Sequence, residues 1–373
     1  MRSEHPLPNP PPSRGRKRWG ATFRQRKTYD KVQIREFMKF RKERLDRGIK
    51  ARCEDIFALS SYREMLYLSL PRLLPVIILL TLPLLKGVIG MYWEKVLMIT
   101  CTIALLALSW DLMASVGLIS LGQALFFGAG AYITGFLNHA FKLPPILSIP
   151  LGTLGGAFFC TLLLLPVLRL RGVYFAIVTL TLPLLLARFI ETTKILGGTE
   201  GMSALSPLPN IWIEMYVPII AMLICLFGFR RLINEDYGLV LQGIRDNDRA
   251  VMSGAINIYS FKAQAVFIAG VAGAFAGAFM THYNQVVGMA AFAMDYSILP
   301  LTAAVLGGVG TFAGPTIGAF ILIPLSEVLR AVGTLRVVFY SAILIICVVG
   351  LPEGVFHYLR RKYHQFERMV DIG

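Results

Sequence analysis

The stretch YGLVLQGIRDNDRAVMSGAINIYSFK at residues 237–262 decides the fold, because it is polar and charged between two long hydrophobic stretches. Its flanks, residues 212–229 and 262–284, have the length and composition of membrane-spanning helices. The apolar residues that recur at three-, four- and seven-residue spacing are Leu241, Ile244, Val251 and Ala255. This spacing predicts one face of an amphipathic helix that lies at a membrane surface. A solvated or lipid-facing loop is the alternative.

Composition predicts that the rest of the chain is an all-α polytopic membrane protein. The 373 residues are 55% hydrophobic and 16% charged, with a mean hydropathy of +0.63, whereas soluble domains carry about 25% charged residues. A span needs about 20 apolar residues to cross the hydrocarbon layer. Ten segments fit: 73–92, 96–116, 118–138, 145–168, 172–190, 212–229, 262–284, 294–312, 315–333 and 337–353. The third, eighth and ninth are rich in glycine, so they can be broken or re-entrant helices.

The distribution of charge predicts the orientation in the membrane. Residues 1–72 hold 19 basic and 8 acidic residues, which supply +11 of the net charge of +15. The excess therefore does not indicate nucleic-acid binding. The basic groups beside the spans are Arg169/Arg171, Arg230/Arg231, Arg245/Arg249/Lys262 and Arg360/Arg361/Lys362. With ten spans and a cytoplasmic N-terminus, every group faces the cytoplasm, as the positive-inside rule requires. Both termini are then cytoplasmic, and we expect Arg171 to contact lipid phosphates.

Three regions follow from these patterns. Residues 1–72 are basic and rich in proline, which predicts a disordered, at most locally helical, cytoplasmic tail that is dispensable. A polybasic anchor for anionic lipids and translation that starts at Met65 are the alternatives. Residues 73–357 form the transmembrane domain, and residues 358–373 form a basic cytoplasmic tail. The five cysteines are scattered and show no metal-ligand spacing, so no metal site is expected.

Four segments, taken in order, resemble one transporter family over roughly residues 75–360. They are residues 120–132 (SLGQALFFGAGAY), 167–180 (VLRLRGVYFAIVTL), 238–262 and 306–315 (LGGVGTFAGP). Together they resemble the M-type permease of branched-chain amino-acid ABC transporters. The resemblance implies a bacterial inner-membrane importer with an H-type second permease, two cytosolic ABC ATPases and an extracytoplasmic solute-binding protein.

The resemblance also implies roles for individual residues. The loop expected to couple to the ATPase contains Gly238, Leu241, Ile244, Arg245, Asp246, Asn247, Asp248, Ala250 and Lys262. The chain has no G-x-x-x-x-G-K-[ST] motif and no catalytic constellation. We therefore expect neither an enzyme nor a bound cofactor, with ATP hydrolysed by the partner subunits. Docking of a helix with charges that fix its register is a physical means of receiving that energy.

Two further sets of residues are candidates for contacts with the solute and the binding protein. The candidate solute pathway contains Asp111, Gly122, Gln123, Gly130, Gly307, Gly308, Gly310 and Gly314. An interhelical hydrogen bond is the alternative role of Asp111, and a tight turn is the alternative at the glycines before Pro315. The candidate contact with the binding protein is Gly197, Gly198, Glu200 and Gly201, for which an unconstrained loop is the alternative.

Three positions depart from the family pattern. Ala255 stands where glycine is usual after the coupling helix, Asp111 stands where asparagine is expected, and Gly197–Gly201 lacks the usual threonine and asparagine. The substrate is thus branched-chain or other apolar amino acids, or alternatively urea or a short amide. A stand-alone secondary transporter is the alternative of a different class, although it would carry more ionisable residues deep within its spans.

Overall fold

A computed structural model describes residues 40–44, 73–85, 90–329, 354–364 and 367–371, and the single positions 342, 345 and 349. The chain divides into two units, residues 57–360 and residues 1–56 with 361–373. The predicted tenth span at 337–353 and most of the two predicted tails lie outside the described residues.

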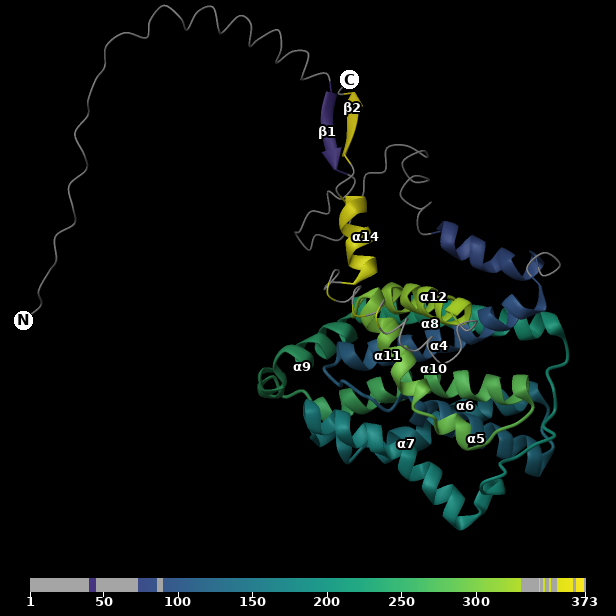
Figure 1. Ribbon diagram of the computed structural model, residues 1–373. Helices are drawn as coiled ribbons and strands as arrows, with labels where there is room; N and C mark the ends of the chain where they lie inside the picture. The colour runs from purple at the N-terminus through teal and green to yellow at the C-terminus, as the bar shows by residue number, and fades with distance from the viewer. Residues whose placement is uncertain are drawn as a thin grey trace, which may run out of the picture. The chain divides into compact units, whose positions relative to one another are not determined.

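The larger unit is a bundle of helices (Figure 1). An apolar helix at Leu73–Leu84 ends in the 3-10 turn η1 (Leu82–Leu85). It is followed by α4 (Met91–Ser115), α5 (Gln123–Phe141), α6 (Pro145–Leu164), α7 (Val173–Thr193), α8 (Ile211–Asn234), α9 (Asp236–Ser253), α10 (Ile258–Asn284), α11 (Asp295–Gly307) and α12 (Ala313–Val328). The 3-10 turns η2 (Val167–Arg169), η3 (Ile195–Gly197) and η4 (Met289–Phe292) lie between them, and α14 (Val355–His364) follows.

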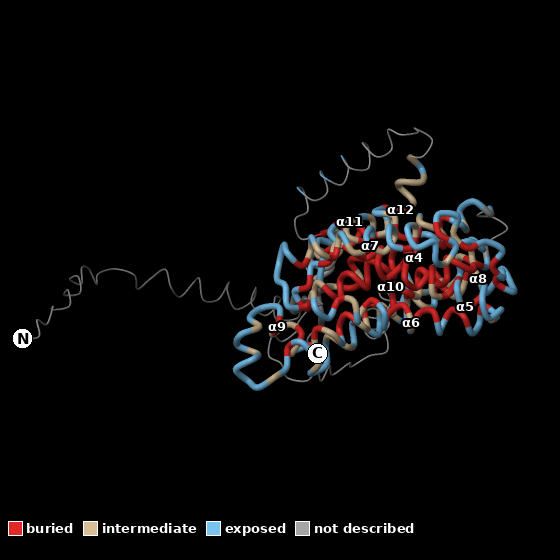
Figure 2. The backbone as a smooth tube through the Cα atoms, turned by 90° about the horizontal axis from the view of Figure 1, so that it is seen from below, coloured by how far each residue is buried: buried red, intermediate tan, exposed pale blue. Residues whose placement is uncertain are grey.

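The core is built around α4 and α10, where buried positions gather (Figure 2). The hydrophobic window of α4 is 89% buried, whereas that of α8 is 22% buried, so α8 leaves most of its surface for lipid or a partner. Small residues let α5 and α10 approach closely. A Cβ on Gly277 would lie 1.9 Å from the carbonyl oxygen of Phe127, and one on Gly130 would lie 2.2 Å from that of Ala274. The glycine spacing of α10 is therefore explained by helix packing.

Six helical segments in the described part of the chain have the length and apolar composition of a membrane span. They are Tyr92–Ser115, Pro145–Leu164, Val173–Thr193, Ile211–Asn234, Ile258–Asn284 and Met289–Gly307, and the shorter apolar helices are Leu73–Leu84 and Ala313–Val328. The predicted third span is α5, a helix of 19 residues that begins at Gln123 rather than at residue 118. The chain is thus a multi-pass helical protein, while the count of ten spans stays a prediction.

The eighth predicted span, 294–312, is not one continuous helix, which agrees with the expectation that it can be broken. The segment Met289–Gly307 contains η4 and then α11, which has only 13 residues. A helix of that length rises about 20 Å, less than the roughly 30 Å of hydrocarbon. Figure 1 shows α11 crossing the bundle rather than running along it. The helix ends because Gly308 has φ 111° and Phe312 has φ 55°, so the predicted break before Pro315 is present between α11 and α12.

The smaller unit contains two short strands where the tail prediction expected no regular structure. Strands β1 (Phe40–Arg44) and β2 (Glu367–Asp371) pair antiparallel, with Phe40 opposite Asp371. The prediction rested on the scarcity of apolar side chains, which does not report main-chain pairing between segments more than 300 residues apart.

Candidate functional site

Helix α9, which contains residues 237–253 of the charged stretch 237–262, lies at one end of the bundle (Figures 1 and 2). Leu241 is fully buried and Ile244 is 4% exposed. They pack in a small cluster with Val116, Ile258 and Ala265 from the ends of α4 and α10. The apolar face predicted from the spacing is confirmed at Leu241 and Ile244. Ala255 lies beyond the end of α9 and is exposed.

The helix is kinked, which the spacing did not predict. Asn247 has φ −158° and ψ 96°, so its backbone is extended within α9. Its Oδ1 accepts a hydrogen bond from the backbone N–H of Ala250 at 3.2 Å, which is how an N-cap asparagine starts a helix. The prediction of one continuous amphipathic helix is corrected to two segments, and the charged residues on either side of Asn247 face different directions.

Three contacts fix α9 to the bundle. A Cβ on Gly238 would lie 2.1 Å from the carbonyl oxygen of Ile233, so glycine lets α9 fold closely against the end of α8. Gly117, with φ +83°, lies in the turn after α4, and a Cβ there would lie 3.3 Å from the Cα of Arg245. Asp248 accepts from Arg171 at 2.8 Å, just before α7. Helix α9 therefore contacts α4, α8, α10 and the segment that leads into α7.

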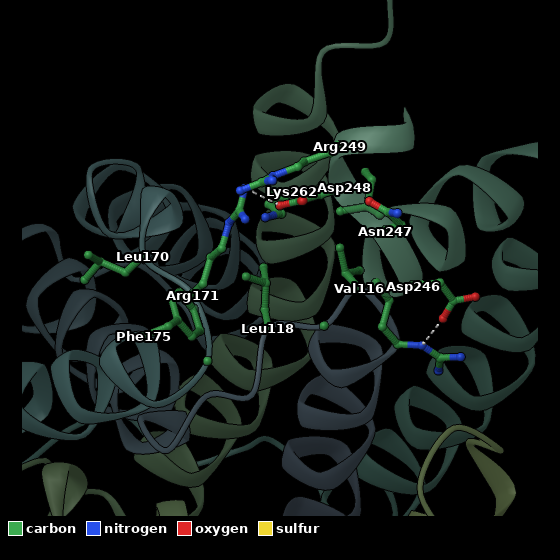
Figure 3. A pocket seen from close by; sticks show the side chains of 14 residues that line it. Val116, Leu118, Leu170, Arg171, Phe175, Asp246, Asn247, Asp248, Arg249 and Lys262 are labelled. Carbon is green, nitrogen blue, oxygen red and sulfur yellow. Dashed lines mark hydrogen bonds and ion pairs between the residues drawn. The ribbon is translucent and has the colours of Figure 1, made fainter. Parts of the chain in front are cut away.

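A cavity of about 340 Å³ lies between α9 and these elements (Figure 3). It is lined by Val116, Gly117, Leu118, Leu170, Arg171, Gly172, Phe175, Ile244, Arg245, Asp246, Asn247, Asp248, Arg249 and Lys262. Lys262, in the second turn of α10, is only 6% exposed. Asp246 lies on the other side of the cavity from Asp248 (Figure 3) and pairs with Arg245 at 3.3 Å. Both side chains of that pair are exposed, at 48% and 71%.

Asp111 is buried in the last turns of α4 and holds the break between α11 and α12. Its Oδ1 accepts from the backbone N–H of Gly310 at 2.6 Å, and its Oδ2 accepts from that of Phe312 at 2.9 Å. Both carboxylate oxygens thus accept hydrogen bonds within the protein. This is the arrangement expected if Asp111 forms interhelical hydrogen bonds, the alternative to a role in the solute pathway. Because the turn after α4 also contacts Arg245, one helix end touches both α9 and the break.

Most of the other candidate pathway residues lie at close contacts between helices, whereas a Cβ on Gly310 would meet nothing within 4 Å. A Cβ on Gly122 would lie 2.1 Å from the carbonyl oxygen of Thr179, so this glycine joins α5 to α7. A Cβ on Gly307 would lie 1.7 Å from the carbonyl oxygen of Gly314, where α11 meets α12. Gln123 is buried, and its Oε1 accepts from Ser109 of α4 at 3.1 Å. The structure distributes these residues over the contacts of α5 with α4, α7 and α10 and over the break between α11 and α12, rather than gathering them in one cluster.

Residues 92–348 match the family described as the branched-chain amino acid transport system / permease component. The chain belongs to this family. The high-affinity branched-chain amino acid transport system permease proteins LivM of Salmonella typhimurium and Escherichia coli are each 26% identical over 271 residues, 64% of this chain and 64% of theirs. The probable LivM protein of Methanocaldococcus jannaschii is 27% identical over 219 residues, 52% of this chain and 63% of its own. This permease thus spans just under two thirds of the length of these curated relatives. No solved structure matches it.

The segment that contains Gly197, Gly198, Glu200 and Gly201 is tied down in this permease. Met202 and Val287 exchange backbone hydrogen bonds of 2.8 and 2.9 Å. A Cβ on Gly201 would lie 2.2 Å from the carbonyl oxygen of Val287, and this glycine has φ +72°. The three glycines all have positive φ. The loop between α7 and α8 is therefore fixed against the segment after α10, which leaves Glu200 exposed.

Sequence reasoning missed two residues that hold α9. Arg171 was assigned to lipid phosphates, but it pairs with Asp248, 77 positions later in the chain. Gly117 was not singled out, although its turn supports Arg245. A glycine after an apolar helix is too common to mark a contact, and nothing in the local pattern relates Arg171 to α9.

Proposed function

We propose that this permease is one membrane-spanning subunit of an ATP-driven importer for branched-chain or other apolar amino acids. The observation that carries the proposal is the exposed, charged end of α9, fixed to the ends of α4, α8 and α10 within a chain of this permease family. The proposed partners are a second permease, two cytosolic ABC ATPases and an extracytoplasmic solute-binding protein. The proposed location is the bacterial inner membrane, with ten spans and both termini in the cytoplasm.

In this proposal α9 receives motion from an ATPase and passes it to the bundle. Val116 and Gly117 transmit it to α4, and the ion pair between Arg171 and Asp248 transmits it to α7. Through Asp111, the end of α4 also reaches the break at Gly310 and Phe312. A displacement of α9 can thereby change the packing of α11 and α12, since packed elements shift between discrete arrangements rather than deform continuously.

The proposal is tested by reversing an exposed pair whose charged groups bond to each other. Arg245 and Asp246 are 48% and 71% exposed in their side chains. The double variant Arg245→Glu with Asp246→Arg keeps their mutual pairing but inverts the charge pattern offered to a partner. We expect the variant to reach the membrane in normal amounts, to lose most co-purifying ATPase and to lose solute-stimulated hydrolysis.

The matched control reverses the exposed pair Arg188 and Glu191 of α7, which are joined at 2.6 Å. This control should keep its ATPase. Wild-type hydrolysis and uptake in the α9 variant would refute the coupling role. A lone permease that transports without any co-purifying ATPase or second permease would refute the importer.

A further inference from the structure

The cavity beside α9 contains more positive than negative charge in one corner. Arg171, Arg249 and Lys262 line it there, and Asp248 is the acidic residue among them (Figure 3). Asp248 is already bonded to Arg171 at 2.8 Å. The corner thus holds three cations around one carboxylate, and the carboxylate is already paired with one of them.

Lys262 is the unusual member of this group. It is only 6% exposed. The negative charge that acts on its ammonium is that of Asp248, and this carboxylate is already bonded to Arg171. A buried charge that is only partly balanced is costly, and proteins normally pair such groups fully. The side chain reaches the cavity (Figure 3). An anion in the cavity would balance the positive charge that Asp248 leaves over.

Arg249 adds a second available cation. It is exposed, forms no ion pair with the described residues, and directs its side chain toward that of Arg171 (Figure 3). Two guanidinium groups that approach each other above an ammonium suit the several oxygens of a phosphate, because each guanidinium can donate two parallel hydrogen bonds.

We propose that Arg171, Arg249 and Lys262 form a binding site for a phosphate group, carried by an anionic phospholipid or by a soluble phosphate. The site stands independently of the transport function proposed above. The cavity volume of about 340 Å³ accommodates a phosphate with a substituent. Val173 and Tyr174, next to Gly172 at the rim, are strongly exposed apolar side chains, which would accompany the acyl chain of a lipid. A bound phosphate would link Arg171, before α7, to Arg249, after the kink of α9.

The test uses the purified full-length chain in nanodiscs, with two arms that separate the sources. In the first arm the nanodiscs contain phosphatidylcholine only, and inorganic phosphate is titrated at constant ionic strength. In the second arm phosphate is absent, and phosphatidylglycerol replaces increasing fractions of phosphatidylcholine. The readout in both is hydrogen–deuterium exchange of the peptides that cover α9 and residues 167–175.

We expect protection of both peptides in at least one arm. Response to inorganic phosphate alone identifies a soluble ligand, and response to phosphatidylglycerol alone identifies a lipid. Arg249→Gln and Lys262→Met should each weaken the apparent affinity about tenfold or more, since each removes a charge-assisted contact. Arg245→Gln is the control on the same helix, because Arg245 pairs with Asp246 across the cavity, and it should keep the response. No protection in either arm, or a response that survives unchanged in Arg249→Gln, overturns the site.

Discussion

At the scale of single residues, Asp111 shows how a charge within an apolar helix can serve the fold. A carboxylate at that depth is costly in lipid, yet it is fully buried in protein here. Its two oxygens satisfy the N–H groups of Gly310 and Phe312, which the break between α11 and α12 leaves without helical partners. The carboxylate therefore replaces backbone bonds that a continuous helix would have made.

Asp111→Asn should destabilise the permease by about 1–3 kcal/mol. Asparagine keeps one acceptor but turns an NH₂ group toward the other backbone N–H, which leaves that donor buried without an acceptor. Thermal unfolding in detergent, followed by tryptophan fluorescence at a fixed scan rate, measures the loss. Thr102→Val is the control, since the Thr102 hydroxyl bonds only Met98 of its own helix. An Asp111→Asn protein that unfolds with the wild type would show that these bonds do not stabilise the break.

The backbone conformation of Ala255 explains why glycine is expected after α9. Its φ of 60° lies in the left-handed region, which costs a residue with a Cβ about 1–2 kcal/mol. Ala255→Gly should stabilise the end of α9 by about 0.5–1 kcal/mol after the entropy of the unfolded chain is subtracted. Hydrogen exchange of the α9 peptide measures the effect.

Ala250→Gly should have the opposite effect and destabilise the same exposed segment. Ala250 lies within the regular second part of α9, where glycine costs about 0.5–1 kcal/mol. Faster exchange in Ala250→Gly and slower exchange in Ala255→Gly is the expected pattern. Equal effects of the two substitutions would contradict the left-handed conformation of Ala255.

At the scale of elements, α9 is held by contacts that join distant parts of the sequence. Among these contacts is the ion pair between Arg171 and Asp248, whose two residues can be swapped without a change in net charge. Arg171→Asp or Asp248→Arg alone should speed exchange at the second part of α9, because each places like charges together. The double exchange should restore most of the protection, with a coupling energy of about 0.2–1 kcal/mol for a partly exposed pair. Additive effects of the two single variants would mean that the pair is not formed.

How far the sequence predicted these elements depends on the range of the interactions. The amphipathic face of α9 was predictable because Leu241 and Ile244 recur at helical spacing. The kink at Asn247 was not, since one N-cap asparagine does not interrupt the spacing of apolar residues. The break before Pro315 was predictable from its glycines, whereas its anchor Asp111 lies 199 positions earlier than Gly310. The partner of a residue far away in sequence is set by packing, which one sequence does not report.

At the scale of the whole molecule, the structure gathers basic groups at one end of the bundle, while the orientation in the membrane stays a prediction. Basic groups lie next to α9 and η2, while the loop tied at Met202 and Val287 lies beyond the other ends of α7 and α10. Apolar length could not say whether residues 294–312 form one helix, because a short crossing helix and its flanking turn have the composition of a span. Residues 294–312 pass beside α5 without forming one long helix.

The orientation is tested by cysteine labelling in a background without native cysteines. Arg245→Cys in α9 and Glu200→Cys in the loop after α7 place one exposed thiol at each end of the bundle. A membrane-impermeant maleimide should label Glu200→Cys in intact cells, and it should label Arg245→Cys only in inverted vesicles. Labelling of both positions from one side would contradict the predicted number of crossings between them.

The glycine contact between Gly308 and Gly354 has a consequence for biosynthesis. A Cβ on Gly354 would lie 2.4 Å from the Cα of Gly308, so the backbone at 354 covers the break at close range. While the chain is being translated, the ribosome must add 46 more residues after Gly308 before this cover exists. Until Gly354 is synthesised, the break is therefore uncovered on that side. Asp111 of α4, which is synthesised earlier, is then the residue that holds it.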